Sequence, residues 1–357
     1  MKIIIEFMIV IILLMTLTSC NLGIGDGEPE KDLGDRILLL NSDGSEDHFF
    51  NRNCRSESGE LYDIFYGNIQ FFNDNRHFFL SNERLIIFDA ETHGIIFILE
   101  DIELDYRDSS SYYYLSDRAC ISNDDNFIAF TSDHGLYYME MATKEYFQIT
   151  DSGRDYFPAF SLDNKVFFCR MDSTGSNCNL MSINLDGTGI EEHCSFIEKL
   201  SRILPGQVDS EMVFIVRGHS YFYQYDRETN QLECLCELPY DCGDIVDRSN
   251  DDKYFSFNNN QNDSDIISTY LYNMDEHLLY SYPEIYPYCN AKIMPDGDSI
   301  IVHYIGGNQA LLYFDYASNT FTYQVQLEHG RLANSTDIID ISNDGQKIAV
   351  ITHILND

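Results

Sequence analysis

The sequence predicts an all-β protein, because short apolar runs alternate with polar turns along almost the whole chain and almost no segment has helical periodicity. One unit recurs along it. Residues Cys120 to Phe130 contain an apolar run, the cluster Ser122-Asn123-Asp124-Asp125 and a second apolar run. Short polar side chains bond to their own backbone and favour a tight turn. The same pattern returns at Ile341 to Val350, so each unit predicts two antiparallel strands joined by a turn.

Weaker copies of this turn recur along the chain at intervals of about 45 residues. The seven turns are Asn73-Asp74-Asn75, Asn123-Asp124-Asp125, Leu162-Asp163-Asn164, Asp209-Ser210-Glu211, Asn250-Asp251-Asp252, Pro295-Asp296-Gly297 and Asn343-Asp344-Gly345. A period of this length with several strands per repeat is typical of radially repeated sheets. We therefore expect a seven-bladed β-propeller, with six blades as the alternative.

The chain begins with a segment that is typical of a secretion signal. Lys2 is followed by the apolar run Phe7 to Leu17, which is too short to cross a bilayer. Leu17-Thr18-Ser19-Cys20 resembles the lipobox of bacterial lipoproteins, which implies cleavage before a lipidated Cys20. An ordinary secretory signal is the alternative. The expected organisation is a signal peptide at 1–20, a flexible tether at 21–35 and the propeller at 36–357.

The chain is strongly acidic, since Asp and Glu outnumber Lys and Arg by 59 to 22 and the net charge is −37. This balance disfavours nucleic acid as a partner and also disfavours direct attraction to anionic lipid. We expect contact with a membrane through the lipid anchor only, and a monomer. A solvated acidic surface is the simplest interpretation of the charge, with cationic ligands or divalent cations as the alternative.

Removing Cys20 from the ten cysteines leaves nine, an odd number whose disulfide pairing the sequence does not define. Cys120 and Cys169 lie in expected strands as small buried hydrophobes. Cys234 and Cys236 are two residues apart, so on a regular strand they project from the same face, close to Cys242. Because no fourth ligand follows at zinc spacing, we expect no metal site and no cofactor.

Each repeat has a second half, which is clearest after Phe130. Thr131 to Gly135 interrupt the extended run, Leu136 to Met141 resume it, and Ala142-Thr143-Lys144 turn into Tyr146 to Thr150. This makes four strands per repeat. The pattern resembles the TolB-like β-propeller family, whose repeat follows F-S-P-D-G-x-x-I-A-F. The resemblance spans residues 68 to 357, but only Pro295-Asp296-Gly297 keeps the P-D-G triplet.

The two ends of the repeat region are each half a blade. The last repeat stops after Ile338 to Ile341 and Lys347 to Ile354. Near the beginning, Ile37 to Leu40 and His48 to Phe50 supply two outer strands with no inner pair. Combining them would close the ring and remove the exposed strand edges that favour aggregation.

The sequence contains none of the common catalytic motifs, and its ten histidines are scattered. Two classes of function remain. The first is a binding or scaffolding propeller for a protein or glycan partner, without enzymatic activity. The second is a propeller-type polysaccharide lyase or glycosidase with its site at the channel mouth. We favour binding, although residues that converge on a channel from separate blades are not visible in a sequence.

Arginine, tyrosine and histidine are concentrated where the loops that enter the innermost strands should meet the loops between the second and third strands of each blade. The candidate partner-binding residues are Arg118, Arg154, Asp155, Tyr156, Arg170, Arg202, Arg217, His219, Tyr286 and His303. Planar guanidinium and aromatic groups are suited to anionic or sugar-like ligands. The alternative is that each arginine pairs with an acid on the neighbouring blade.

The first testable prediction concerns localisation. If Cys20 carries the lipid, Cys20→Ser moves the protein from the membrane fraction to the soluble fraction and abolishes incorporation of labelled fatty acid. Several acyl chains anchor a protein stably, which explains the size of the expected change. Because Asn21, and not an aspartate, follows Cys20, the lipoprotein sorting rule favours the outer membrane. Unchanged fractionation without lipid label would exclude the anchor.

Overall fold

The structure is a computed structural model. We describe the unit formed by residues 34–355. The described residues are 35–41, 45–50, 53–55, 61–63, 68–81, 84–104, 118–196, 200–209, 211–217, 221–238, 245–258, 269–282, 291–295, 297, 299–304, 310–315, 318, 320–326 and 339–353. In this part of the chain there is no helix with the length and apolar character needed to cross a membrane.

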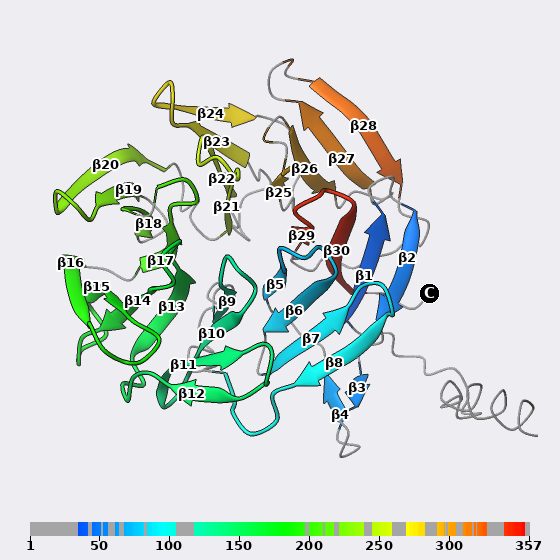
Figure 1. The fold of residues 1–357 in the computed structure, drawn as a ribbon. Coiled ribbons are helices and arrows are strands. Elements are labelled where there is room, and N and C mark those ends of the chain that lie inside the picture. Colours follow the sequence, from blue (N-terminus) through cyan, green and yellow to red (C-terminus); the bar gives the residue numbers. More distant parts are fainter. Residues whose placement is uncertain are drawn as a thin grey trace, which may run out of the picture. The chain divides into compact units, whose positions relative to one another are not determined.

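The strands form four-stranded antiparallel sheets, which are arranged in a ring (Figure 1). Six sheets, blades 1 to 6, consist of consecutive strands. Blade 1 comprises β5 (Asn68–Phe71), β6 (His77–Ser81), β7 (Leu85–Asp89) and β8 (Gly94–Ile98). Blade 2 comprises β9 (Ala119–Ile121), β10 (Phe127–Ser132), β11 (Gly135–Glu140) and β12 (Tyr146–Gln148). Blade 3 comprises β13 (Asp155–Phe160), β14 (Val166–Met171), β15 (Cys178–Ile183) and β16 (Glu191–Phe196).

The remaining three consecutive blades follow the same order, from the innermost to the outermost strand. Blade 4 comprises β17 (Leu200–Pro205), β18 (Met212–Arg217), β19 (Tyr221–Asp226) and β20 (Gln231–Glu237). Blade 5 comprises β21 (Ile245–Arg248), β22 (Tyr254–Asn258), β23 (Thr269–Asn273) and β24 (Leu278–Tyr282). Blade 6 comprises β25 (Ala291–Ile293), β26 (Ser299–Tyr304), β27 (Ala310–Asp315) and β28 (Thr320–Gln326).

A seventh four-stranded sheet, the composite sheet, joins the two ends of the chain. It comprises β29 (Ile339–Ile341), β30 (Lys347–His353), β1 (Asp35–Asn41) and β2 (Glu46–Phe50). β1 pairs with β30 without a break in register, from Asp35↔His353 to Asn41↔Lys347. The predicted pairing of the amino-terminal strands with the carboxyl-terminal strands is confirmed, and β29 lies against β5 of blade 1 (Figure 1).

One sheet was not expected from the sequence. The strands β3 (Asn53–Arg55) and β4 (Leu61–Asp63) form a two-stranded sheet, and in the chain they follow β2 of the composite sheet and precede β5 of blade 1. Strands of three residues carry too little periodicity to be recognised.

The repeated turn joins the innermost strand of a blade to its second strand, and side chains within the turn stabilise it. In blade 2, Ser122 Oγ donates to Asp124 Oδ1 at 2.7 Å and accepts from Phe127 N at 2.9 Å. In the composite sheet, Ser342 makes the same bonds with Asp344 and Lys347 N, at 2.7 and 2.9 Å. The serine and the aspartate thus satisfy the turn backbone locally, as side chains of these types do at tight turns.

In every repeated turn except that of blade 4, the last residue adopts a left-handed backbone, with φ of 60° at Asn75, 59° at Asp125 and 69° at Gly345. Asn, Asp and Gly tolerate this conformation best. The Asp125 side chain also connects blade 2 to blade 1. Its carboxylate accepts from Asn73 N and from Asp74 N of blade 1, each at 2.9 Å. Asn75 Oδ1 likewise accepts from Asp344 N of the composite sheet at 3.1 Å.

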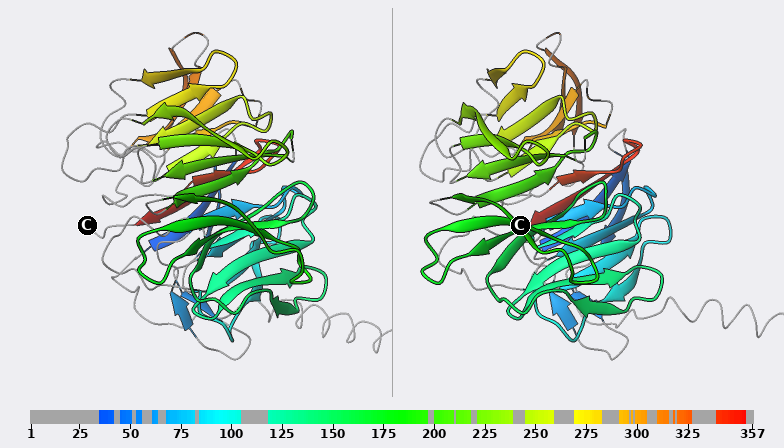
Figure 2. Two further views of the ribbon diagram at one scale, coloured as in Figure 1. Left: turned by 90° about the vertical axis from the view of Figure 1, so that its left-hand side faces the viewer. Right: turned by 60° about the vertical axis from the view of Figure 1, so that its left-hand side comes forward.

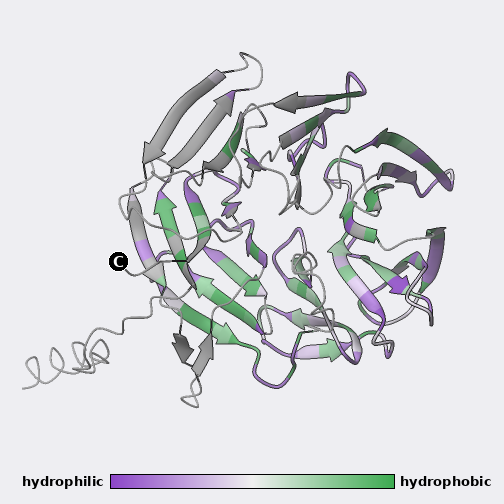
Figure 3. Cartoon of the chain, turned by 180° about the vertical axis from the view of Figure 1, so that it is seen from behind, coloured by the Kyte–Doolittle hydropathy of each residue, from purple (hydrophilic) through white to green (hydrophobic). Residues whose placement is uncertain are grey.

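The apolar core lies between neighbouring sheets and not within a single sheet. Ile37 and Leu39 of β1 pack with Phe78 and Phe88 of blade 1, and the next cluster joins Phe79 to Phe130 of blade 2. Further clusters join blades 2 and 3, 3 and 4, and 4 and 5. Burying one such side chain contributes about 1.5–3 kcal/mol. Figure 2 shows the stacked sheets from two sides, and Figure 3 shows hydrophobic residues along their strands.

The second prediction tests the composite sheet. Deleting residues 36–50 removes β1 and β2, exposes the edge of β30 and uncovers the blade 1 core that Ile37, Leu39 and Phe50 bury. Because a domain is stable by only about 5–15 kcal/mol, loss of several such side chains is expected to cause aggregation. Size-exclusion chromatography and thermal melting measure this. Deleting residues 21–35 is the length-matched control, and equal behaviour of both deletions would contradict the composite sheet.

Candidate functional site

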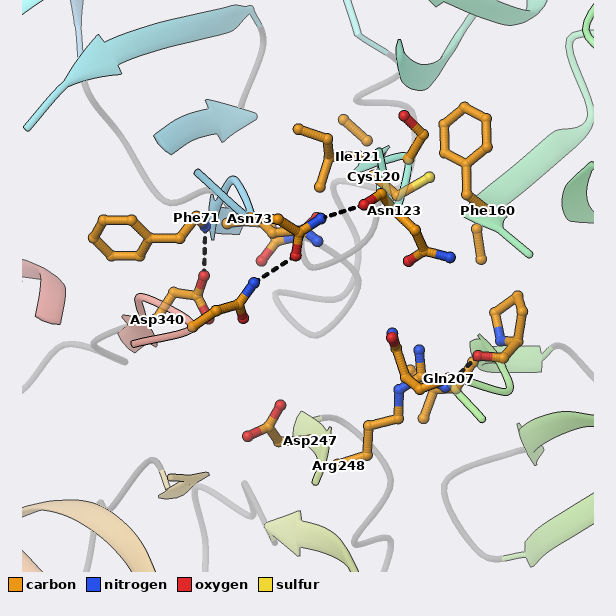
Figure 4. Close-up of a pocket in the computed structure, with 18 of the residues that line it drawn as sticks. Phe71, Asn73, Cys120, Ile121, Asn123, Phe160, Gln207, Asp247, Arg248 and Asp340 are labelled. Atoms are coloured by element: carbon orange, nitrogen blue, oxygen red, sulfur yellow. Dashed lines mark hydrogen bonds between the residues drawn. The ribbon is translucent and has the colours of Figure 1, made fainter. Parts of the chain in front are cut away.

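A central cavity of about 440 Å³ lies among the innermost strands (Figure 4). Its lining comes from β5, β9, β13, β17, β21, β25 and β29, together with the turns that follow several of them. The charged and amide residues of the lining are Asn68, Gln70, Asn73, Asn123, Arg202, Gln207, Asp247, Arg248, Asn250, Lys292, Asp340 and Asn343. The cavity is therefore polar, with an apolar contribution from residues such as Ile121 and Phe160.

Three of these charged residues occupy equivalent positions in neighbouring sheets. Asp247, Lys292 and Asp340 each stand three residues before the first residue of the repeated turn. Lys292 Nζ lies 3.2 Å from Asp247 Oδ1 and 3.0 Å from Asp340 Oδ1. We call these three residues the ion ladder, because they connect blade 5, blade 6 and the composite sheet around the cavity.

The two carboxylates of the ion ladder also satisfy backbone groups at the inner edges of the sheets. Asp247 Oδ2 accepts from Ile293 N at 2.7 Å, and Asp340 Oδ2 accepts from Phe71 N at 2.6 Å (Figure 4). An innermost strand has no neighbour on its cavity side, so such N–H groups need an acceptor. Each aspartate therefore joins its own sheet to the next one as well as to Lys292.

The protonation of the ion ladder follows from its burial, since its side chains are only 13–20% exposed. Burial raises the pKa of Asp340 above its ordinary value, while Lys292 and the Phe71 N–H oppose the rise. Burial alone would lower the pKa of Lys292, but Asp247 and Asp340 together raise it above its ordinary value of 10.5. Lys292 is thus a fixed cation at neutral pH and is not suited to act as a nucleophile.

Arg248 is a second buried cation beside the ladder. Its Nη1 donates to Pro205 O of blade 4 and lies 3.4 Å from Asp252 Oδ1. Burial lowers the pKa of Arg248 to about 10, against the opposing influence of Asp252 and Asp247. Arg202 of β17 lies near enough to lower the pKa of both Arg248 and Lys292. Basic groups therefore come from three consecutive blades.

Amide side chains surround the end of the cavity at which the repeated turns lie. Asn343 Nδ2 donates to Asn73 Oδ1, and Asn73 Nδ2 donates to Asn123 O at 2.8 Å (Figure 4). These contacts connect the composite sheet with blades 1 and 2. Gln207 and Asn250 contribute further amides from blades 4 and 5. We call Asn73, Gln207, Asn250 and Asn343 the amide arc. An amide both donates and accepts, so the amide arc suits hydroxyl, amide or carboxylate groups of a ligand.

Among the candidates whose side chains the structure describes, Arg202 alone lines the central cavity. Arg154 is exposed, Arg118 is half-buried, and Tyr156 packs against the core cluster between blades 3 and 4. Asp155 is fully buried and pairs with Arg170, with Nε–Oδ1 and Nη2–Oδ2 distances of 2.7 and 2.8 Å. Asp155 and Arg170 lie opposite each other on β13 and β14, so this arginine pairs within its own blade and not with a neighbouring one.

The remaining candidates fall partly or wholly outside the described residues. Arg217 ends β18 and His303 belongs to β26, but their side chains are not described. His219, Tyr286 and the lipidation candidate Cys20 lie outside the described residues. Their roles stay predictions.

Arg170 lines a second opening, the outer groove, between blades 2 and 3. It has a volume of about 390 Å³ and is lined by Gln148, Ile149, Thr150, Asp151, Arg170, Ile183, Gly187 and Ile190. Arg170 therefore lies at a site other than the central cavity, which separates two groups of candidates that the sequence placed together.

The described residues include one serine next to a histidine, since His193 Nε2 lies 2.8 Å from Ser182 Oγ. Ser182 is completely buried, and His193 is stacked on Phe167 with a centroid distance of 5.3 Å. Neither residue lines the central cavity or the outer groove. A nucleophile must reach its substrate, so this pair is part of the packing between β15 and β16.

The expected common face of Cys234 and Cys236 is wrong. Cys234 pairs with Tyr223 and Cys236 with Phe222, which are adjacent residues, because a β-bulge interrupts the register between them. The bulge turns the two thiols to opposite faces. Cys234 is exposed, whereas Cys236 packs against the core, where burial raises its pKa to about 12. Within the described ranges, no three His, Cys, Asp or Glu side chains are grouped to hold a metal ion.

Sequence reasoning missed the ion ladder and the amide arc. The signal was present in the repeats, since aligning them on the turn shows Asp247, Lys292 and Asp340 where blades 2 and 3 have Cys120 and Ala159. Charged residues at otherwise apolar, equivalent positions of an innermost strand indicate a polar cavity lining.

The fold and the cavity define the protein as a β-propeller with four antiparallel strands in each blade. No protein-family model matches the chain, and no curated protein matches it in sequence. An oligogalacturonate lyase in complex with manganese aligns with a TM-score of 0.54 and 12% identity, over 80% of this chain and 88% of that chain. The oligogalacturonate lyase of Vibrio parahaemolyticus aligns with a TM-score of 0.54 and 11% identity, over 81% of this chain and 89% of that chain.

A third similar structure is TolB from Acinetobacter baumannii, with a TM-score of 0.48 and 13% identity over 93% of this chain and 67% of that chain. At such low identities, the likeness to the two lyases shows the propeller fold alone.

The third prediction concerns the ion ladder. Lys292→Met leaves Asp247 and Asp340 facing each other without a cation, so we expect a loss of about 3 kcal/mol in unfolding free energy at neutral pH. The loss should shrink as the pH falls, because the pKa of Asp340 is raised in the folded state and protonation on acidification removes its buried charge. Urea denaturation at neutral and mildly acidic pH measures this.

Lys253→Met is the matched control, since Lys253 is half-exposed and its pair with Asp251 lies on the surface. A loss for Lys292→Met that did not depend on pH would contradict the assignment of the ladder as the cause.

Proposed function

We propose that the protein is a lipid-anchored, extracytoplasmic β-propeller that binds a protein or glycan partner through its central cavity. The observation that supports this proposal is the lining of that cavity, in which amides and basic groups from separate sheets converge on one space. The groups are held in place before a ligand arrives, because Asn73, Lys292 and Arg248 each bond to neighbouring sheets. Such preorganisation reduces the cost of binding.

The chemistry of the lining supports a ligand with hydroxyl, amide or carboxylate groups. The amide arc offers donors and acceptors to hydroxyl groups, and Arg202 adds a planar guanidinium that suits a carboxylate. The cavity lining has three basic residues against two aspartates, whereas in the whole chain Lys and Arg number 22 against 59 acids. The lining is thus a local departure from the acidic composition. An anionic group is therefore accommodated better here than elsewhere on the protein.

The proposed cellular localisation rests on the amino-terminal sequence. Cys20 in a lipobox-like context and the tether at 21–35 would hold the propeller at the cell envelope, on the periplasmic or surface side. The outer membrane is the favoured location. A tether of this length leaves the cavity accessible to large partners.

The fourth prediction tests the cavity with purified full-length protein and three probes: tri-galacturonate, neutral chitotriose and a tetraglutamate peptide. We expect tri-galacturonate or the peptide to bind, and Arg202→Gln to weaken that binding by about tenfold or more, since a charged hydrogen bond is lost. Isothermal titration calorimetry, with and without divalent metal, measures the affinity.

Arg154→Gln is the control, because Arg154 is exposed and lies outside the cavity lining. Melting temperatures should stay unchanged in both variants. Loss of binding in Arg154→Gln but not in Arg202→Gln would move the site to the entering loops, and failure of all three probes to bind would reject this ligand chemistry.

A further inference from the structure

The outer groove lies where the chain passes from blade 2 to blade 3, just after β12. Ile149 in its lining still bonds to β11, since its N–H donates to Leu136 O at 2.8 Å. Ile149, Ile183 and Ile190 form an apolar floor between the two blades. Ile190 is 49% exposed, which is a large exposed fraction for an aliphatic side chain beside a recess.

One end of the groove carries a guanidinium in a fixed position. Arg170 uses Nε and Nη2 to bind the buried Asp155, and its guanidinium carbon lies 5.3 Å from the centroid of Phe168. Asp155 also accepts from Thr150 Oγ1 at 2.5 Å. Nη1 has no acceptor among the described residues, so it can donate to a carbonyl oxygen of a ligand.

The charge around the groove is negative. Asp155 neutralises Arg170, while Asp151 in the lining is exposed and close enough to raise the pKa of Arg170. Asp186, which precedes Gly187 of the lining, is also exposed. A partner with basic residues on both sides of an apolar one is complementary to this arrangement.

We propose that the outer groove docks an extended segment of a protein partner, with an aliphatic side chain on the isoleucine floor, a backbone carbonyl on Arg170 Nη1 and basic side chains at Asp151 and Asp186. The site is separate from the central cavity and does not depend on what that cavity binds. It gives the propeller a second contact on its rim.

Binding of a labelled peptide, Lys-Lys-Ile-Leu-Lys-Lys, to the purified full-length protein tests the proposal by fluorescence anisotropy. The peptide should bind in a salt-dependent way, and its counterpart with glutamates in place of lysines should not. Ile190→Gln should weaken binding at least about fivefold, because the aliphatic contact is lost. Asp151→Asn should weaken binding and reduce its salt dependence.

Leu278→Gln is the matched control, since Leu278 is an aliphatic residue with 52% exposure on blade 5, away from the groove. It should leave binding unchanged. The proposal is overturned if the basic peptide does not bind, if the acidic peptide binds equally well, or if Leu278→Gln weakens binding as much as Ile190→Gln.

Discussion

The antiparallel pairing of β1 with β30 is the constraint on which the rest of the ring depends. From the composite sheet through blade 5, the described residues of each sheet cover the apolar face of the next. The cluster that contains Ile37 and Phe88 exists only because the amino-terminal strands complete the composite sheet. The same closure brings Asp340 to Phe71 N, although the two residues are 269 positions apart in the chain. The central cavity is therefore a consequence of ring closure, because its lining includes residues from both the composite sheet and blade 1.

A ring of sheets creates a second requirement, since the inner edge of every innermost strand has backbone groups with no strand beside them. Asp247 and Asp340 meet this requirement for Ile293 N and Phe71 N, and they hold Lys292 between them. Polar residues therefore line the cavity for a structural reason before any ligand is considered. The same bonds fix the positions of the side chains, which is what a binding site requires of its supporting residues.

The parts that the sequence predicted are those with local causes. The turn around Asp124 is specified by side chains that bond within five residues of one another, and the composite sheet follows from two incomplete repeats. The contacts of Lys292 were not predictable in this way, because they depend on which strands face each other across the cavity. The bulge that separates Cys234 from Cys236 also has no signal in hydrophobic alternation, and a single extra residue inverts the face of every side chain beyond it.

The distribution of charge gives the acidic composition a structural meaning. Aspartates serve as acceptors in the repeated turns, as with Asp124, and as clips between sheets, as with Asp125. The few basic groups at the two openings are held by such acids, with Lys292 between two aspartates and Arg170 on Asp155. The charges of Lys292 and Arg170 are thus largely compensated. The two openings therefore differ in their neutral groups, because amides dominate the central cavity whereas isoleucines form the floor of the outer groove.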